Sequence, residues 1–303
     1  MMASGADAKK TRGIRLTARD AQILEALYGV GYLTTHQICA LFFSESQGTM
    51  GPTKACERRM RLLHSAGLVR RIEQPVMRGE GSKPFIYALS KKGAEFLITE
   101  TGIDPADIDW RPQSFEANTP FLNHLLLTTD LRIALMKASK QAEVAVTEWI
   151  DERELRVGKM FDYVMLTSPT GQEVRTAVIP DAVFVLERNG KRALFFVEID
   201  LRTVTVEPKL FERKGMSKKF RTYEIYFDTP EFLTRYEGRR ARVLTVTTGE
   251  KRLNNLKQVA ERAAPESKGL FWFSTFDLAL DPAKLLASPI WMVAGDDTPH
   301  TLL

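Results

Sequence analysis

This sequence has little cysteine and no long apolar run. Cys39 and Cys56 are the only cysteines in 303 residues, too few for a disulfide framework and without zinc-ligand spacing. We expect both to be reduced thiols that fill space between helices. No apolar stretch reaches the roughly 18 residues that cross a membrane, and the basic N-terminus lacks the apolar block of a secretory signal. These absences predict a cytoplasmic protein without a membrane partner.

Motifs of common enzyme classes are also missing. There is no glycine-rich GxxxxGK[ST] loop, which argues against an NTPase, and no GxSxG turn of the hydrolases. The four histidines, at positions 36, 64, 124 and 300, have no zinc-ligand spacing. His124 follows an apolar helix start, so we expect a buried histidine with satisfied hydrogen bonds; a ligand or catalytic base is the alternative.

Positive charge is concentrated in the first third of the chain. Residues 1–100 contain 15 Lys and Arg against 9 Asp and Glu, whereas the remainder contains 28 against 29. Such an asymmetry indicates a polyanionic partner for the first third. A solvated basic surface would give the same counts, so the arrangement of the residues has to decide.

The first hundred residues follow the order of a winged helix-turn-helix. Thr17 and Asp20 have the spacing of a capping box, and Gly29 and Gly31 are expected to end the helix that follows. Apolar spacing and turn residues predict the remaining elements. In order, the elements are a helix after Thr17, a helix opening at Leu33, a basic helix over 52–67, strands over 68–72 and 84–89 that form the wing, and a closing helix from Ser90.

The basic helix has two different sides. An apolar side, traced by Ala55, Arg59, Leu62, Leu63 and Ala66, is expected to pack on its own domain. The basic side is then free to face phosphates and base edges of duplex DNA. The residues expected to contact DNA, from this helix and the wing, are Lys54, Arg58, Arg61, His64, Ser65, Arg70, Arg71, Arg78 and Lys83.

From residue 120 the pattern changes to one long helix followed by strands alternating with helices. We expect a disordered basic arm at 1–15, the winged helix-turn-helix at 16–100, a linker at 101–119, an α/β domain at 120–293 and a flexible tail at 294–303. Within the α/β domain, we predict a helix over 120–140, strands over 144–149, 161–167, 178–186 and 193–200, a basic helix over 208–226, a strand over 241–247, a helix over 251–263 and a last strand over 270–273.

Two strands of this second domain carry an acidic motif. Pro180-Asp181 on one strand and Glu198-Ile199-Asp200 on the next, joined by an Asn-Gly turn, resemble the signature of the PD-(D/E)xK nucleases. The resemblance implies an αβββαβ core, so the whole chain would be α+β or α/β. The motif lysine is missing, because Asp200 occupies its position.

The nuclease resemblance leaves two alternatives for the acids. In an active nuclease, Asp181, Glu198 and Asp200 would hold Mg²⁺ or Mn²⁺, and Lys219 and Tyr223 of the following helix would join the catalytic group. In a degenerate nuclease fold, the acids would form salt bridges to Arg202, Lys209 or Lys219, and no cofactor would be bound. We expect the degenerate case, because a third carboxylate stands where the motif places a lysine.

The combination of the two domains is more specific than either alone. A winged helix followed by IPDAVFVL, ALFFVEIDLRT and KKFRTY is similar to the replication-relaxation family of plasmids and mobile elements, over roughly residues 16–250. The resemblance implies a sequence-recognising double-stranded DNA-binding protein in replication or relaxation, or in its regulation. A relaxase or replication protein and a second copy of the chain are further expected partners. The alternatives are a metal-dependent endonuclease targeted by the winged helix and an adaptor that binds only protein.

Overall fold

The structure is a computed structural model that describes residues 14–43, 51–74, 83–101, 120–168, 170–206 and 215–303. The chain divides into two compact units, Met1–Asn118 and Thr119–Leu303. Within the described ranges, no helix is both long and apolar enough to cross a membrane. The predicted linker and most of the N-terminal arm lie outside the described residues.

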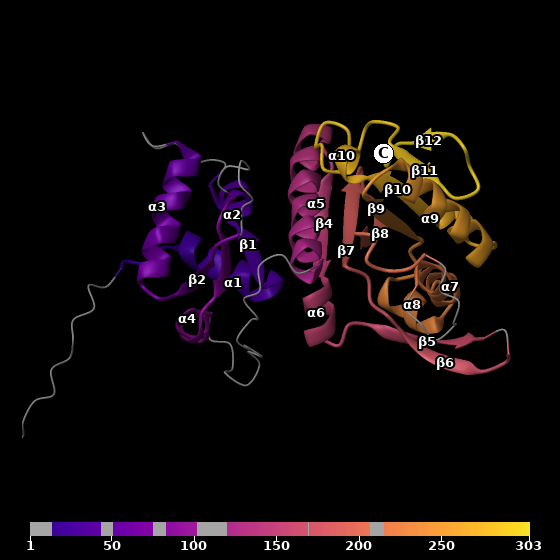
Figure 1. The fold of residues 1–303 in the computed structure, drawn as a ribbon, viewed down its shortest axis with the longest axis horizontal. Coiled ribbons are helices and arrows are strands. Elements are labelled where there is room, and N and C mark those ends of the chain that lie inside the picture. The colour runs from indigo at the N-terminus through magenta and orange to yellow at the C-terminus, as the bar shows by residue number, and fades with distance from the viewer. Residues whose placement is uncertain (1–13, 44–50, 75–82, 102–119, 169, 207–214) are drawn as a thin grey trace, which may run out of the picture. The chain divides into compact units, whose positions relative to one another are not determined.

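The N-terminal unit combines helices with a small antiparallel sheet (Figure 1). The sheet has the strand order β1–β3–β2. The sequence predicts a helix from Leu33 and no strand here; in the structure Leu33 lies in β1, and Thr34 is the N-cap of α2, in a capping box with Gln37. The described elements are α1 (Ala18–Val30), β1 (Tyr32–Thr34), α2 (Thr35–Phe42), α3 (Pro52–Ser65), β2 (Val69–Ile72), β3 (Ile86–Leu89) and α4 (Lys91–Thr101).

The helix boundaries of this unit follow from local chemistry. The predicted capping box of Thr17 and Asp20 is present at the start of α1. Gly31 ends α1 with a φ of 85°, in the left-handed region that glycine adopts without a Cβ penalty, whereas Gly29 lies inside the helix. Pro52 opens α3, where its missing N–H costs no hydrogen bond.

Helix α3 buries a different row of residues from the one predicted. Cys56, Met60 and Leu63 face the core of the unit. Leu62, which the spacing placed on the apolar side, is 41% exposed. Each residue turns the helix by about 100°, so a shift of the buried row by one position brings Leu62 to the surface.

The C-terminal unit is built on a seven-stranded mixed sheet in the order β12–β11–β10–β9–β8–β7–β4. Strand β9 is parallel to both β8 and β10, and the other pairs are antiparallel. The fold is therefore mixed α+β. Its elements are α5 (Pro120–Ala142), β4 (Ala145–Asp151), α6 (Glu152–Val157), β5 (Asp162–Thr167), β6 (Glu173–Val178), β7 (Ala182–Arg188), β8 (Lys191–Asp200), α7 (Met216–Tyr226), α8 (Pro230–Arg235), β9 (Ala241–Thr247), α9 (Glu250–Ala263), a 3₁₀ turn (Lys268–Leu270), β10 (Phe271–Thr275), α10 (Phe276–Ala279), β11 (Trp291–Val293) and β12 (Pro299–His300).

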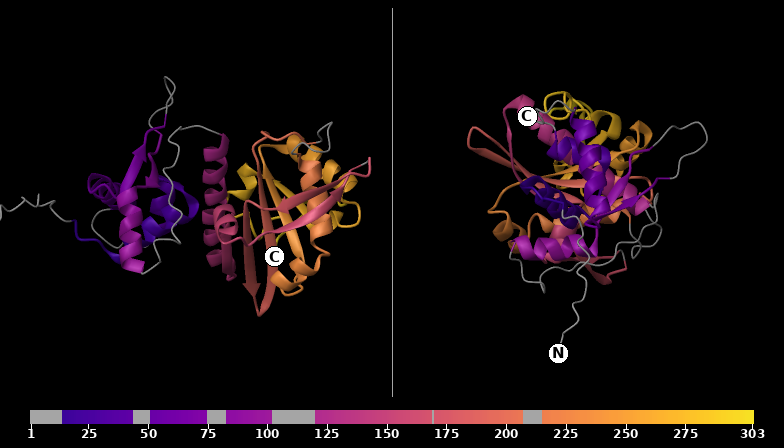
Figure 2. Two further views of the ribbon diagram at one scale, coloured as in Figure 1. Left: turned by 90° about the horizontal axis from the view of Figure 1, so that it is seen from below. Right: turned by 90° about the vertical axis from the view of Figure 1, so that its left-hand side faces the viewer.

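Helices cover both faces of this sheet (Figures 1 and 2). Helix α5 packs on one face, and α7, α8, α9 and the β5–β6 ribbon pack on the other. Successive side chains of a strand point to opposite faces, so along β8 Phe195 belongs to the core under α5 and Phe196 to the core under α7. Glu198 and Asp200 continue the α7 side of this alternation.

Two of the predicted segments of this unit differ in the structure, which also contains the short elements α6, α8, α10 and β11 that were not predicted. The expected strand over 178–186 is interrupted around Pro180, so that β6 pairs with β5 in a separate ribbon and only β7 joins the large sheet. The segment expected to be a flexible tail is packed instead: β12 pairs with β11, and Leu302 is buried with its N–H donating to the carbonyl of Leu286 at 3.2 Å. Leu302 belongs to the core under α5.

Candidate functional site

The described residues that were expected to contact DNA all lie at the surface of the N-terminal unit. They come from α3, from β2 and from Lys83, three residues before β3. These exposed residues are Lys54, Arg58, Arg61, His64, Ser65, Arg70, Arg71 and Lys83. Arg78 lies outside the described residues.

Arg59 has an internal partner and is the exception among the arginines of α3. Its guanidinium donates to the carboxylate of Asp20, with Nε 2.6 Å from Oδ1, and to the carbonyl of Arg15 at 3.0 Å. Asp20 is fully buried. Burial by itself raises the pKa of Asp20, but hydrogen bonds from Arg59 and Thr17 outweigh it and hold the pKa below its ordinary value. Arg59 therefore fastens α3 to α1.

Arg71 is partly engaged on the sheet of the same unit. Its guanidinium lies over the ring of Phe85, 4.2 Å from the centroid, and 3.3 Å from a carboxylate oxygen of Glu73. A cation over an aromatic face is held by the ring quadrupole. The contact aligns the Arg71 side chain along the β2–β3 strand pair.

In the C-terminal unit, two buried carboxylates lie next to each other on adjacent chain segments. The register pairs Ala182 of β7 with Val197 of β8, so Asp181 and Glu198 occupy the next position along. The N–H of Ile199 donates to Asp181 Oδ2 at 2.7 Å. Their exposures are 7% for Asp181 and 2% for Glu198, so each needs partners to remain charged.

Side chains from both faces of the sheet supply those partners. Lys219 and Tyr223, one turn apart on α7, both donate to the carboxylate of Glu198. His124, near the start of α5, has Nε2 3.0 Å from Asp181 Oδ2. Because α5 and α7 cover opposite faces of the sheet, His124 and Lys219 approach the two carboxylates from opposite sides.

Burial and neighbouring charges shift the pKa values of these side chains in opposite directions. Burial raises the pKa of Glu198 to about 7, with Lys219 acting against burial and Asp181 acting with it. Burial also acts to raise the pKa of Asp181, but Lys219 and His124 outweigh it and hold that pKa below its ordinary value. Burial acts to lower the pKa of His124, yet its hydrogen bond to Asp181 raises it. The environment therefore holds the pKa of Glu198 above that of Asp181.

Asp200 faces the same side of β8 as Glu198 but has partners of its own. Arg252 of α9 donates to both carboxylate oxygens at 2.8 Å, and Thr247 of β9 donates to Oδ2 at 2.7 Å. Arg252 also donates to the carbonyl of Val204 at 2.7 Å. The third carboxylate of the motif is thus neutralised by an arginine.

Comparison with known proteins agrees with the sequence resemblance. The profile of the replication-relaxation family matches residues 24–240. This chain belongs to the replication-relaxation family. No curated protein matches it. A solved structure of restriction endonuclease FokI is similar over 86% of this chain and 42% of that chain, with 11% identity and a TM-score of 0.28. The chain thus spans less than half the length of that structure, and a TM-score this low does not define a shared fold.

The acidic group of this replication-relaxation protein does not fit a divalent cation as it is arranged. Lys219 and Tyr223 occupy the oxygens of Glu198, and Asp200 is held by Arg252. In the part of the chain that the structure describes, no three His, Cys, Asp or Glu side chains are grouped to hold a metal. Cation binding would require Lys219 to leave Glu198.

Two members of the group escaped the sequence argument. His124 was expected to be buried with satisfied hydrogen bonds; it is half-buried, with Nε2 3.0 Å from both the Ile199 carbonyl and Asp181 Oδ2, and the contact with Asp181 was not predicted. Arg252 had no signal at all, since it lies 52 positions after Asp200. Thr245, which the register pairs with Glu198, is fully buried, and its hydroxyl finds no hydrogen-bond partner among the described residues.

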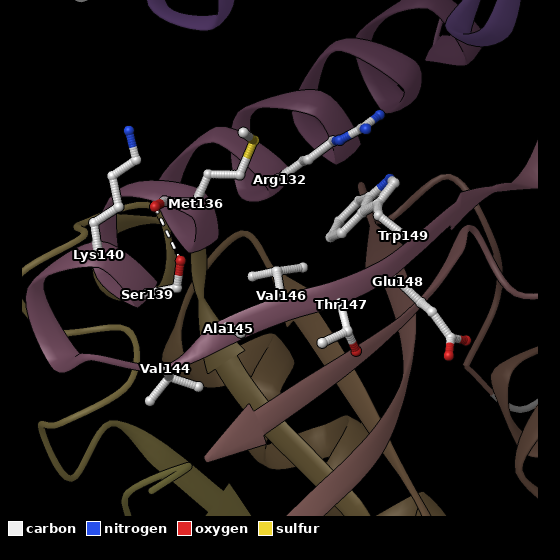
Figure 3. A pocket seen from close by; sticks show the side chains of 10 residues that line it. All are labelled: Arg132, Met136, Ser139, Lys140, Val144, Ala145, Val146, Thr147, Glu148 and Trp149. Carbon is white, nitrogen blue, oxygen red and sulfur yellow. Dashed lines mark hydrogen bonds between the residues drawn. The ribbon is translucent and has the colours of Figure 1, made fainter. Parts of the chain in front are cut away.

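A cavity of about 410 Å³ lies elsewhere in the unit, between α5 and the edge strand β4 (Figure 3). Arg132 and Met136 of α5 face Val146 and Trp149 of β4 across it. Arg132 also donates to Asp151 at 3.3 Å. The predicted site residues are not among the residues that line this cavity.

Proposed function

We propose that this replication-relaxation protein is a sequence-recognising double-stranded DNA-binding protein that acts in plasmid or mobile-element replication or relaxation, or in its regulation. In this proposal the N-terminal unit is a winged helix-turn-helix. Helices α2 and α3 form the helix-turn-helix, α3 is the recognition helix, and the β2–β3 strand pair is the base of the wing. The antiparallel order β1–β3–β2 and the packing of α2 on α3 support it.

The division of α3 into two sides is the observation that carries the proposal. Lys54, Arg58, Arg61 and Ser65 recur at helical spacing and are all exposed, while Arg59 is used internally. Lysine and arginine bind phosphates, and arginine can pair with a guanine edge in the major groove. The exposed cations of α3 lie in one row, on the side of the helix opposite its buried residues. A surface that is only solvated has no need of this arrangement.

The C-terminal unit is proposed to be a degenerate nuclease-like domain that serves as a second contact surface or an assembly module. Lys219 and His124 neutralise Asp181 and Glu198, and Arg252 neutralises Asp200. These ion pairs support a structural role for the three carboxylates. A relaxase or replication protein, or a second copy of the chain, is the partner proposed for this unit, and no metal cofactor is needed.

Titration of labelled duplex DNA with the full chain tests the proposal. We expect fluorescence anisotropy to show binding whose affinity falls with salt, because each phosphate contact releases counterions. Competition with a pool of random duplexes, followed by sequencing of the retained DNA, should enrich one motif. A salt-independent signal, or binding without enrichment, would refute sequence recognition, and no binding would favour the protein-binding adaptor.

A metal-dependent endonuclease remains the second candidate, and one observation favours it. Lys219 reaches Glu198 from α7, where a displaced motif lysine would stand. The same ion pair is expected of the degenerate fold, so activity has to decide. Supercoiled plasmid incubated with the protein and Mg²⁺ or Mn²⁺ should stay uncut, and the thermal midpoint should not rise. Nicking that is lost in Asp181→Asn and in Glu198→Gln would establish the endonuclease instead.

A further inference from the structure

The two cysteines of the chain lie between the helices α2 and α3, and their side chains are neighbours. Cys56 Sγ lies 3.7 Å from the carbonyl oxygen of Thr35 in the first turn of α2, and Cys39 Sγ lies 4.0 Å from Thr53 Oγ1 in the first turn of α3. Thr35 and Cys39 are one turn apart on α2, and Thr53 and Cys56 are close to one turn apart on α3. Each thiol therefore faces the helix that carries the other.

The two thiols differ in their access to solvent. Cys56 is fully buried, whereas Cys39 is partly exposed. Burial raises the pKa of Cys56 to about 12, and the neighbouring Cys39 thiol acts in the same direction. A reagent in solution therefore reaches Cys39 first, and Cys56 stands behind it.

We propose that Cys39 and Cys56 are an oxidisable dithiol that hydrogen peroxide converts to an intramolecular disulfide, and that this modification weakens duplex binding by α3. Formation of the disulfide depends only on the packing of the two helices. The effect on duplex binding rests on the proposed function.

The chemistry takes two steps. The Cys39 sulfur attacks one oxygen of the peroxide, the O–O bond breaks, hydroxide leaves and is protonated to water, and Cys39 becomes a sulfenic acid. The Cys56 sulfur then attacks the Cys39 sulfur, the S–O bond breaks, and the hydroxide leaves with the Cys56 proton as a second water. Two electrons pass from the thiols to the peroxide. The second step is the slower one, because Cys56 is protonated.

The disulfide would affect DNA binding by changing the position of α3. A disulfide needs an S–S distance of about 2.05 Å, well inside the contact distance of two thiols. Cys56 shares the core with Met60 and Leu63 of the same helix, so the proposal is that forming the S–S bond changes the packing of α3. Arg58 and Arg61 lie on the same helix, so their side chains shift relative to the rest of the unit.

The full-length protein is treated with hydrogen peroxide and, separately, with dithiothreitol. Intact mass should fall by two hydrogens in the oxidised sample, peptide mapping should find Cys39 linked to Cys56, and dimedone should trap Cys39 at short times. Affinity for duplex should drop on the order of tenfold and return with dithiothreitol. Cys39→Ser is the matched control. It cannot form the disulfide but retains every methionine that peroxide could also oxidise, so it should keep its affinity for duplex in peroxide.

Three results would overturn the proposal. They are the absence of the Cys39–Cys56 linked peptide, linkage only between separate chains, and an equal loss of affinity in oxidised Cys39→Ser. Circular dichroism checks that the variant folds, with Cys39→Ala as a replacement if it does not. If the reduced protein fails to bind duplex at all, the proposed function fails, while the mass measurement still decides whether the dithiol forms.

Discussion

Replacing Arg59 with alanine should destabilise the N-terminal unit, because the variant leaves the buried carboxylate of Asp20 without its cation. Removing one partner of a buried ion pair costs about 3–5 kcal/mol of unfolding free energy. The N–H and hydroxyl of Thr17 still donate to Asp20 Oδ2, both at 2.7 Å, so we expect the lower end, about 3 kcal/mol. At roughly 4–8 °C for each kcal/mol, the midpoint of this unit should fall by about 12–24 °C.

Calorimetry of the full chain measures this change, and tryptophan fluorescence assigns the transitions. Trp149, Trp272 and Trp291 belong to the C-terminal unit, and the fourth tryptophan, Trp110, falls within the range of the N-terminal unit. With Trp110→Phe introduced into both proteins, a transition without a tryptophan fluorescence change comes from the N-terminal unit. Arg58→Ala is the matched control. It removes the same charge from an exposed position and should change stability by less than about 0.5 kcal/mol. A loss below about 1 kcal/mol in Arg59→Ala would refute the reasoning.

The same ion pair predicts a pH dependence with a definite sign. The pKa of Asp20 is lowered in the folded protein, so the ionised carboxylate adds stability above its ordinary pKa of 3.8, and that stability is lost as the pH falls through the lowered value. The N-terminal unit of the wild type should therefore lose stability below about pH 4. Arg59→Ala should lose less over the same interval, and an unchanged acid dependence would show that Arg59 does not set this pKa.

Three further outcomes concern the C-terminal unit. Arg252→Met should lower its unfolding free energy by about 3 kcal/mol in a denaturant titration, since Asp200 is 4% exposed and would lose its cation; a loss below about 1 kcal/mol would contradict this. The pKa of Glu198 is raised to about 7, so the thermal midpoint should fall as the pH rises from 4.5 to 7, and Glu198→Gln should flatten that fall; an equally steep variant would count against it. Leu302→Ala should cost about 2 kcal/mol by the same titration, because a buried side chain leaves a cavity, whereas a mobile tail would show no change.

Local chemistry allowed much of the N-terminal unit to be predicted. The capping box at Thr17, the glycine stop at Gly31 and the proline at the start of α3 are all present where sequence placed signals for them. Strand β1 was missed because three residues carry no periodicity, and its pairing with β3 depends on a segment about fifty positions later. The buried row of α3 was displaced by one position because Met60 was not counted as an inward residue.

The candidate acidic site was predictable only in part. The Pro-Asp and Glu-x-Asp motif pointed to Asp181 and Glu198, and the nuclease resemblance implied Lys219 and Tyr223 of the following helix, which do contact Glu198. His124 comes from the opposite face of the sheet, and the sequence has no means of relating α5 to the end of β7. The segment 294–303 was predicted to be a flexible tail because most of its residues are polar. The burial of Leu302 depends on contact with Leu286, which the sequence does not reveal.

Binding of duplex DNA by variants of α3 tests the central claim most directly. Arg58→Ala with Arg61→Ala removes two exposed charges from the proposed recognition helix. Lys91→Ala with Lys251→Ala removes two exposed charges from α4 and α9. Anisotropy titrations over a range of salt concentrations should show a much weaker complex for the α3 variant, with a salt slope shallower by about two units, and wild-type behaviour for the control. Equal affinity and slope in both variants would contradict the assignment of α3 as the DNA-contacting helix.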